Sequence, residues 1–517
     1  MNLFITFVLA LLPIIWLVIA LVGLKMKASL ASWGALAVAF VEAVALWHMS
    51  FTNAALAALE GFAMAVWPIV MVIIAAIFTY NITVHTGAME DIKAMITSVS
   101  NDKRVLVILI GWCFGGFMEG MAGYGTAIAI PASMLYALGF DPVVSILVCL
   151  IANACPTMFG AIGIPTSSLA ASVSLDSLTL AFAQVVQVWP LLMLSPFLMI
   201  LLFAKKGLKS FEGLVPFLLV AGLSIVIPEF IVAKFVGPDL PMVVGGVCAL
   251  VACFAFALKF LPNEKTPEEF RVESTNDALS DLSVDKALVS WSPFILILVI
   301  LLGTSKLVPF IYNPLSAIKS TFVIYPESTF TAQWIETPGV LVMIAGLIGA
   351  RIQGCSLQDI LSVLKATVKQ MSQTILTMLG VVACAKIMGY AGMINDIATF
   401  FVTTLGSFFP FVSPFIGALG TFVTGSGTSS GLLFGGVQKQ AATTIGADPY
   451  WLVAANSLGT SAGKMLAPQS IAIGCAACDL SGKDGEILGK IAKYALVFVI
   501  LMALITYFGA GLWEVIK

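Results

Sequence analysis

The sequence predicts an all-α polytopic membrane protein with about twelve transmembrane helices and two re-entrant hairpins. Of its 517 residues, 60% are hydrophobic and only 10% are charged, whereas a soluble domain carries about 25% charged residues. Apolar runs of the roughly 20 residues that cross a bilayer recur from end to end. Two further apolar stretches are rich in Gly, Ser and Thr at their centres and do not fit simple spans.

The expected spans follow the apolar runs in chain order. They lie near residues 3–24, 29–49, 61–84, 143–173, 179–203, 213–233, 240–260, 288–311, 338–355, 370–390, 450–476 and 487–513. The net charge of −2, without a basic face, argues against a nucleic-acid partner. The nine cysteines form no Cys/His set with metal-binding spacing, and no cofactor is predicted.

The two unusual stretches, 105–139 and 411–446, are interpreted as re-entrant hairpins. Irregular backbone at membrane depth is tolerated only where it is buried in protein or lines a cavity. If the N-terminus lies outside and both stretches return to the side from which they enter, most loop lysines and arginines fall on one side. That side is then the cytoplasm, because cytoplasmic loops of membrane proteins carry an excess of Lys and Arg.

An internal repeat relates the two halves of the chain. Each half carries a glycine-rich hairpin sequence, then a Gly-x-Asp-Pro turn, then Asn, Gly and Pro at equal spacings. The matched pairs are Asn153 and Asn456, Gly160 and Gly463, and Pro165 and Pro468. The predicted units are a first inverted repeat (1–210), connecting spans (211–260), a cytoplasmic linker (261–287) and a second inverted repeat (288–517).

Inverted repeats whose broken helices meet at the bilayer midplane are the architecture of secondary transporters. The free N–H groups at helix breaks suit a carboxylate, and hydroxyl groups can bond both a carboxylate and an alcohol. The expected binding residues lie at the hairpin tips and the breaks. They are Gly123, Asn153, Thr424, Ser426, Thr428, Ser429, Ser430, Asn456, Lys464 and Gln469. For the glycine- and serine-rich tip the alternative is close helix packing, and for Asn153 it is bonding of freed backbone.

Three ionisable residues in apolar surroundings are the candidates for charge chemistry. Glu119 is either a proton carrier, because apolar burial favours a neutral carboxyl group, or a structural cap. Lys464 is expected to pair with a substrate carboxylate, or with Glu119 in an empty site. The alternative is that its side chain extends to the membrane–water interface. Lys386 is either a second coupling charge or a partner of Asp396, and the second reading is favoured.

At these residues the sequence resembles the L-lactate permease family of bacterial proton symporters. The matching stretches are GWCFGGFMEGMAGYGTAIAIP, ANACPTMFGAIGIP, FVTGSGTSSGLLF and AANSLGTSAGKMLAPQSIAIGCAA. The resemblance implies uptake of lactate, and often glycolate, with a proton across the bacterial inner membrane. It also implies an elevator motion of a transport domain against a scaffold domain. Glu119 and Lys464 match the family's acidic and basic positions.

One position departs from the family pattern. Gly427 stands where some members carry Asp in TGSDTSS, so the resemblance assigns more of the proton coupling to Glu119. Lys386 stands where some members have an uncharged residue.

The predicted function is therefore import of L-lactate, with D-lactate or glycolate, together with a proton. The expected partners are the small acid, the proton and the lipid bilayer, and a homodimer is left open. One alternative is a sodium-coupled carboxylate or dicarboxylate transporter, and another is an anion channel. An enzyme is not predicted, since no nucleophile–base or metal set is present.

Overall fold

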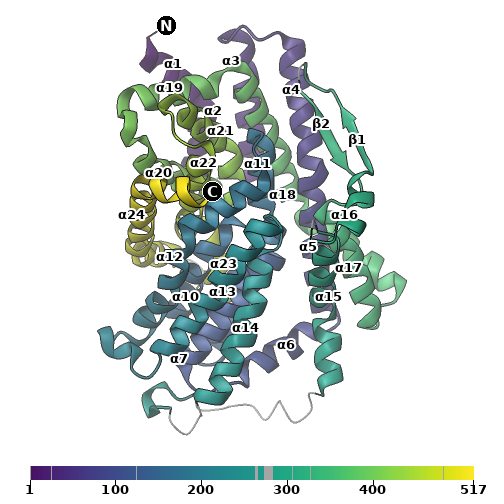
Figure 1. Ribbon diagram of the computed structural model, residues 1–517, viewed down its shortest axis with the longest axis vertical. Coiled ribbons are helices and arrows are strands. Elements are labelled where there is room, and N and C mark those ends of the chain that lie inside the picture. Colours follow the sequence, from purple (N-terminus) through teal and green to yellow (C-terminus); the bar gives the residue numbers. More distant parts are fainter. Residues whose placement is uncertain are drawn as a thin grey trace.

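The structure is a computed structural model that describes residues 2–24, 26–123, 125–261, 266–272, 283–305, 307–326, 328–480 and 483–517. Within these ranges the chain is almost entirely helical and forms a tall bundle (Figure 1). Eleven helical segments of the described chain are long and apolar enough to cross a membrane, and a bent N-terminal pair makes a twelfth. The predicted polytopic helical fold is confirmed.

The helices of membrane length are either continuous or interrupted by a break. Those without a break are α3 (Ala28–Ala45), α12 (Ser177–Ala204), α13 (Val215–Phe235), α14 (Pro241–Phe260), α15 (Val284–Gly303), α18 (Leu357–Ala391) and α24 (Asp484–Ile516). The bent pair is α1 (Leu3–Ala10) and α2 (Leu12–Val18), and α4 (Phe51–Met64) continues into α5 (Met71–His85). Pro68 follows Trp67 at the join of α4 and α5, where the helical dihedral angles are interrupted.

Shorter helices link these spans. They are α6 (Ala88–Thr97), α7 (Lys103–Leu106), α16 (Pro309–Ser316), α17 (Pro338–Ile352) and α19 (Met393–Leu405). The predicted and observed sets of spans differ although their number agrees. The predicted span 338–355 is a 15-residue helix, and the predicted span 450–476 is broken, as its sequence indicated; neither is among the eleven. Conversely, Lys103–Met121 and Met393–Thr424 have membrane length.

The stretch predicted as the second hairpin, 411–446, is a helical hairpin. Its arms are α20 (Phe409–Thr424) and α21 (Gly427–Ile445), and the chain reverses at Gly425, which has a φ of 71°. Ser430 Oγ donates to the Gly417 carbonyl (2.9 Å), and Ser413 Oγ donates to Gln438 Oε1 (2.7 Å). These pairs flank the turn almost symmetrically, so the arms run antiparallel.

The stretch predicted as the first hairpin, 105–139, has the same form. A π-helical segment (Val107–Phe114) leads into α8 (Gly115–Met121), and α9 (Thr126–Ala137) returns beside it. Gly115 lies against Ala127 and Pro131 of the returning arm. That the two hairpins enter the membrane from opposite sides stays a prediction, as do the inverted repeats.

Both predicted broken helices are interrupted, but in different ways. After α10 (Pro142–Ala154) the chain is irregular until α11 (Ile164–Val173), and Gly160 has a φ of 51° there. In the second half, α22 (Pro449–Leu466) and α23 (Pro468–Ala477) are separated by the extended residue Ala467 alone. Gly463 is therefore inside a helix, whereas its sequence match Gly160 lies in the irregular segment.

The glycines of α22 have a packing function instead. A Cβ added at Gly459 or Gly463 would lie 2.0 or 2.2 Å from the carbonyl oxygen of Pro414 or Ala418 on α20. A Cβ at Gly417 would lie 2.1 Å from the Asn456 carbonyl oxygen. Small residues at these positions let the two helix backbones approach closely. The second hairpin is thereby fixed against the second broken helix.

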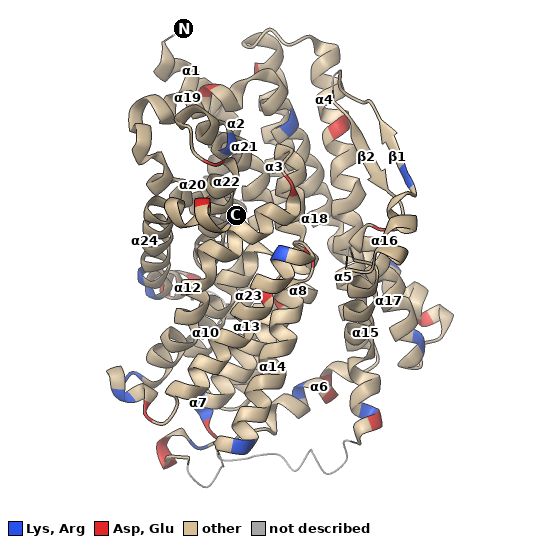
Figure 2. Cartoon of the chain, viewed as in Figure 1, with Lys and Arg blue, Asp and Glu red and all other residues tan. Residues whose placement is uncertain are grey.

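The helices form two groups that meet between α18 and α21. Helices α3, α4, α5, α15, α17 and α18 pack against one another, and the hairpins and broken helices form the other group (Figure 1). Lysines and arginines gather around α6 and α7 at the lower end of the molecule (Figure 2), whereas the N-terminus lies at the upper end. The assignment of the groups as scaffold and transport domains stays a prediction.

Two segments differ from the helical bundle. One forms a pair of strands, and the other is the predicted linker. The strands β1 (Lys319–Phe322) and β2 (Phe330–Gln333) pair antiparallel, with Lys319 opposite Gln333, so the all-α prediction is wrong there. Of the predicted linker 261–287, residues 262–265 and 273–282 lie outside the described residues. Its described portion bonds the chain before α7, through Val272 N–H and the Asn101 carbonyl (2.9 Å).

Candidate functional site

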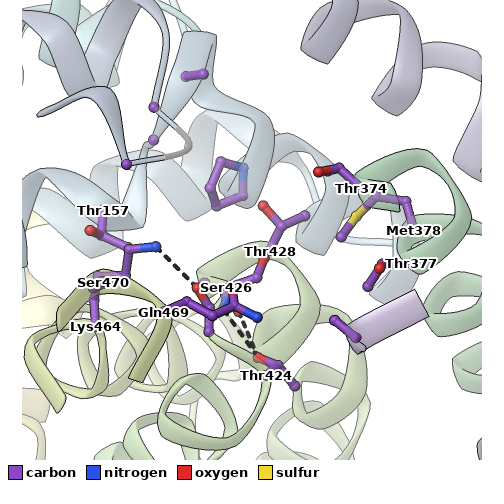
Figure 3. A pocket seen from close by; sticks show the side chains of 18 of the residues that line it. Thr157, Thr374, Thr377, Met378, Thr424, Ser426, Thr428, Lys464, Gln469 and Ser470 are labelled. Carbon is purple, nitrogen blue, oxygen red and sulfur yellow. Dashed lines mark hydrogen bonds between the residues drawn. The ribbon is translucent and has the colours of Figure 1, made fainter. Parts of the chain in front are cut away.

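A cavity of about 400 Å³ lies where the two hairpin tips and the two helix breaks meet (Figure 3). Its lining combines residues from both halves of the chain with one face of α18 and the start of α3. Seven of the predicted site residues line it: Glu119, Gly123, Thr424, Ser426, Thr428, Lys464 and Gln469. The predicted convergence of four elements is present in the described chain.

The second tip presents a helix N-terminus to the cavity. Thr424 ends α20, and its Oγ1 donates to the Gly420 carbonyl (2.8 Å) and the Ser426 carbonyl (3.1 Å). Ser426 caps α21 by accepting the Ser429 N–H (3.3 Å). Gly427 and Thr428 then form the first turn of α21 and line the cavity. The free N–H groups and the positive end of this helix favour an anion here.

Lys464 brings a positive charge to the same tip. It lies in the last turn of α22, where a cation is stabilised by the helix dipole. Its Nζ donates to the Gly425 carbonyl (3.0 Å), and the side chain reaches the cavity wall beside Gln469 and Ser470 (Figure 3). The ammonium group has three donors, so further donors remain for a ligand.

Glu119 faces the cavity from α8. Only 4% of the residue is exposed, and its Oε2 has no hydrogen-bond partner in the described structure. Its charge interacts with that of Lys464. No ion pair within 4.0 Å joins the two side chains, so the predicted pairing in an empty site takes the form of a longer-range attraction.

Among the described residues, the charged groups of the cavity wall are two cations and one acid. Besides Glu119 and Lys464, the lining contains Lys27, an exposed residue before α3. With Glu119 ionised the wall carries one net positive charge, and with Glu119 protonated it carries two. Hydroxyl groups of the tip and of α18 complete the polar lining. This is an environment for a small organic anion.

Three predicted residues are buried near the cavity without lining it. Ser429, Asn153 and Asn456 have side-chain polar atoms with no hydrogen-bond partner among the described residues. The expectation that Asn153 bonds freed backbone with its side chain is therefore wrong; its carbonyl instead accepts Thr157 Oγ1 (2.7 Å). Ser430 bonds across the hairpin and serves packing, which was the alternative for this run.

Lys386 lies away from this cavity. Its Nζ forms an ion pair with Glu60 Oε1 (2.9 Å), and Tyr390 OH donates to the same oxygen (2.7 Å). The predicted pairing with Asp396 is wrong, because Asp396 accepts Trp47 Nε1 (2.8 Å). A role of Lys386 in coupling stays a prediction.

Sequence reasoning missed two sets of residues. The first comprises Glu42, Glu60 and Glu229, which are buried carboxyl groups within apolar helices. The rule that singled out Glu119, one ionisable residue in an apolar run, would have found them. The second set lines the cavity: Thr157, Ser470 and the α18 residues Thr374 and Thr377. Their sequences carry no comparable signal, because hydroxyl residues are frequent in membrane helices.

Among the described residues, no group of three or more His, Cys, Asp and Glu side chains could hold a metal ion. All nine cysteines are free. The described lining of the cavity offers ammonium, carboxyl, hydroxyl and amide groups.

Comparison with known proteins gives four findings. The model of a family described as L-lactate permease matches residues 6–513. An L-lactate permease of Streptococcus iniae is 37% identical over 86% of this chain and 93% of its own. The glycolate permease GlcA of Escherichia coli is 32% identical over 96% of this chain and 94% of its own. A crystal structure of the Alcanivorax borkumensis YdaH transporter has a TM-score of 0.47 at 12% identity, covering 85% of each chain.

Proposed function

The chain belongs to the L-lactate permease family and is a multi-pass protein of the bacterial inner membrane, and from this premise we propose that it imports L-lactate together with a proton. Glycolate and D-lactate are proposed as further substrates. The names of relatives, which include L-lactate and glycolate permeases, support a short 2-hydroxy monocarboxylate. The chemistry of the cavity supports the same class of substrate.

The observation that carries this proposal is the pairing of Lys464 with the tip of the second hairpin. The Lys464 ammonium and the N-terminus of α21 provide donors for a carboxylate on one side of the cavity. The hydroxyl groups of Thr424, Ser426 and Thr428 lie on the same tip and can bond a 2-hydroxyl group. A dicarboxylate would need a second cation at this depth; Lys27 lies at the exposed rim.

Glu119 is the proposed proton carrier. When Glu119 is ionised, its charge attracts Lys464 and weakens the positive potential that a substrate carboxylate meets. Protonation of Glu119 removes that competition, so proton and carboxylate bind together more favourably than either binds alone. Release on the other side reverses both steps. This reciprocity couples the two fluxes without direct contact between the proton and the substrate.

We propose that transport occurs by an elevator motion. The hairpins and broken helices carry the cavity and are packed backbone to backbone between α20 and α22, which suits movement as one body. The group around α3 and α18 supplies the opposing wall as the scaffold. Enrichment of Lys and Arg at the lower end favours that end as cytoplasmic (Figure 2). The hairpins would then enter from opposite sides, as inverted repeats require.

Purified protein in liposomes tests the substrate class. Uptake of labelled L-lactate should be competed by unlabelled D-lactate and glycolate and much less by a dicarboxylate such as succinate. Replacing sodium with potassium should leave uptake unchanged. Dependence on sodium would support a sodium-coupled carboxylate transporter instead, and conductance without saturation or counterflow would indicate an anion channel.

A further inference from the structure

A second polar cavity, of about 300 Å³, lies between α18, α19, α21 and the end of α11. Two lysines, Lys386 and Lys439, line it together with the amides of Asn395 and Gln440. No Asp or Glu occurs among the described residues of its wall. A wall with cations and amides but no acid suits a small anion rather than a cation.

The two lysines differ in how their charge is balanced. Lys386 is paired with the buried carboxylate of Glu60, so this pair adds no net charge. Lys439 Nζ donates to the Val173 carbonyl at the end of α11, and no carboxylate of the described chain lies within 4.0 Å of it. Lys439 is half-buried and keeps donors for another partner. The positive charge of this cavity is therefore mainly that of Lys439.

The second cavity and the central cavity lie along the same two helix faces. On α21, Thr428 lines the central cavity, and Leu432, Gly436 and Lys439 line the second one. These positions are spaced by four, four and three residues, so they share one helix face, and about 16 Å of helix separates the first from the last.

Helix α18 repeats this arrangement on the opposite wall. Thr374 and Met378 line the central cavity, whereas Val382 and Lys386 line the second, again at intervals of four. Along their helices, buried Val382 and Leu432 come between the residues that line the central cavity and the two lysines of the second cavity. The facing sides of α18 and α21 thus carry a central polar site and a second polar site, with apolar side chains between them.

We propose that the second cavity is a carboxylate-binding subsite, in which Lys439 holds the substrate before it passes the apolar side chains of Val382 and Leu432 toward the central cavity. This inference rests on the proposed function. The subsite lies toward the end of the molecule opposite α7, which that proposal assigns to the outside. The carboxylate is held by Lys439 and the amides of Asn395 and Gln440, while the Lys386–Glu60 pair keeps the wall in shape.

The test is Lys439→Gln, with initial uptake of labelled L-lactate measured in right-side-out membrane vesicles. The expected result is a fall in kcat/KM of roughly tenfold, because charged clefts raise local substrate concentration by at least that factor. Lys439→Arg should retain most of the rate. The wild-type value should fall as salt is raised, and that dependence should be weaker in Lys439→Gln.

Lys319→Gln is the matched control, because Lys319 is an exposed cation on β1 that does not line the second cavity. It should leave kcat/KM within about twofold, the size of a screened surface effect. Asn395→Asp is an independent variant that places an acid in the wall, and it should lower kcat/KM by a similar factor to Lys439→Gln.

Unchanged kcat/KM in both Lys439→Gln and Asn395→Asp would overturn the subsite, as would an equal fall in Lys319→Gln. These results are distinct from failure of the proposed function, which would appear as absence of lactate uptake by the wild-type protein. Normal wild-type uptake with unaffected Lys439→Gln and Asn395→Asp variants would refute the subsite alone.

Discussion

Glu119 of α8 and Lys464 of α22 face one cavity from opposite halves of the chain, and their charges interact without a direct ion pair. A close ion pair would satisfy both groups and would have to break before a substrate carboxylate could bind Lys464. The observed separation leaves Lys464 bonded to the Gly425 carbonyl and leaves one carboxyl oxygen of Glu119 without a partner. Each group is thus available to an external partner, the carboxylate for Lys464 and the proton for Glu119.

Glu119→Gln should abolish accumulation of lactate against its gradient while leaving exchange across the membrane. The amide keeps the shape of the side chain but cannot carry a proton. The substrate carboxylate can therefore still bind, but a proton gradient cannot drive its accumulation. Accumulation and counterflow are measured in the same liposomes. Glu42→Gln is the control, since Glu42 is also a buried membrane carboxyl group but does not line the cavity. Full accumulation by Glu119→Gln would remove Glu119 from the coupling step.

Lys464→Met should raise the KM for lactate roughly 10- to 100-fold, the loss expected for a hydrogen bond to a charged group worth about 1.5–3 kcal/mol. Methionine preserves most of the apolar stem, so packing of α22 is little changed. Lys27→Met should have a smaller effect, because Lys27 lies at the exposed rim where water screens its charge. Equal affinity in Lys464→Met and wild type would refute the carboxylate contact.

Gly425→Ala should weaken substrate binding about tenfold, the change in affinity that 1.4 kcal/mol produces. Its φ of 71° costs an L-residue roughly 1–2 kcal/mol, and an added Cβ would lie 2.5 Å from Gln469 Oε1. Gln469 must then leave its position on the cavity wall.

Gly446→Ala separates these two effects. Gly446 has a φ of 72°, and an added Cβ would meet nothing within 4 Å. Both variants should lose similar thermal stability, but only Gly425→Ala should lose affinity. An equal loss of affinity in both would show that strain alone, rather than the position of Gln469, is responsible.

The Glu60–Lys386 pair is expected to stabilise the fold rather than carry the proton. Lys386→Met leaves the Glu60 carboxylate, 2% exposed, without its cation and should cost about 3 kcal/mol of stability. The double variant Glu60→Gln with Lys386→Met removes both charges and should recover most of that loss. Thermal unfolding in detergent measures the stability, and proton-driven uptake by the double variant should persist. Loss of coupling in a stable double variant would instead support Lys386 as a coupling charge.

Hydropathy predicted the helical membrane fold well, and it failed where polar residues extend a helix. Helix α18 was expected near 370–390 but begins at Leu357, where Ser356 and Asp359 cap each other's backbone N–H groups. Lys365 and Lys369 lower the apolar character of that first part. A capping pair followed by periodic apolar residues was the available signal.

The site was predictable to the extent that its residues stood out chemically. Glu119 and Lys464 interrupt apolar sequence, and the tip at Thr424–Thr428 is a dense run of glycine and hydroxyl residues. The wall contributed by α18 was not predictable, since Thr374 and Thr377 become significant only when tertiary packing places that face opposite the tip.

The central claim, that one proton accompanies one carboxylate through this cavity, is tested most directly by lactate accumulation in liposomes of the wild-type protein. An inward pH gradient is imposed with potassium as the only cation and the membrane potential clamped at zero. Transient accumulation above the external concentration, abolished when the gradient is collapsed by a protonophore, is the predicted result. Equilibration to the external concentration alone, with or without the gradient, would contradict the account.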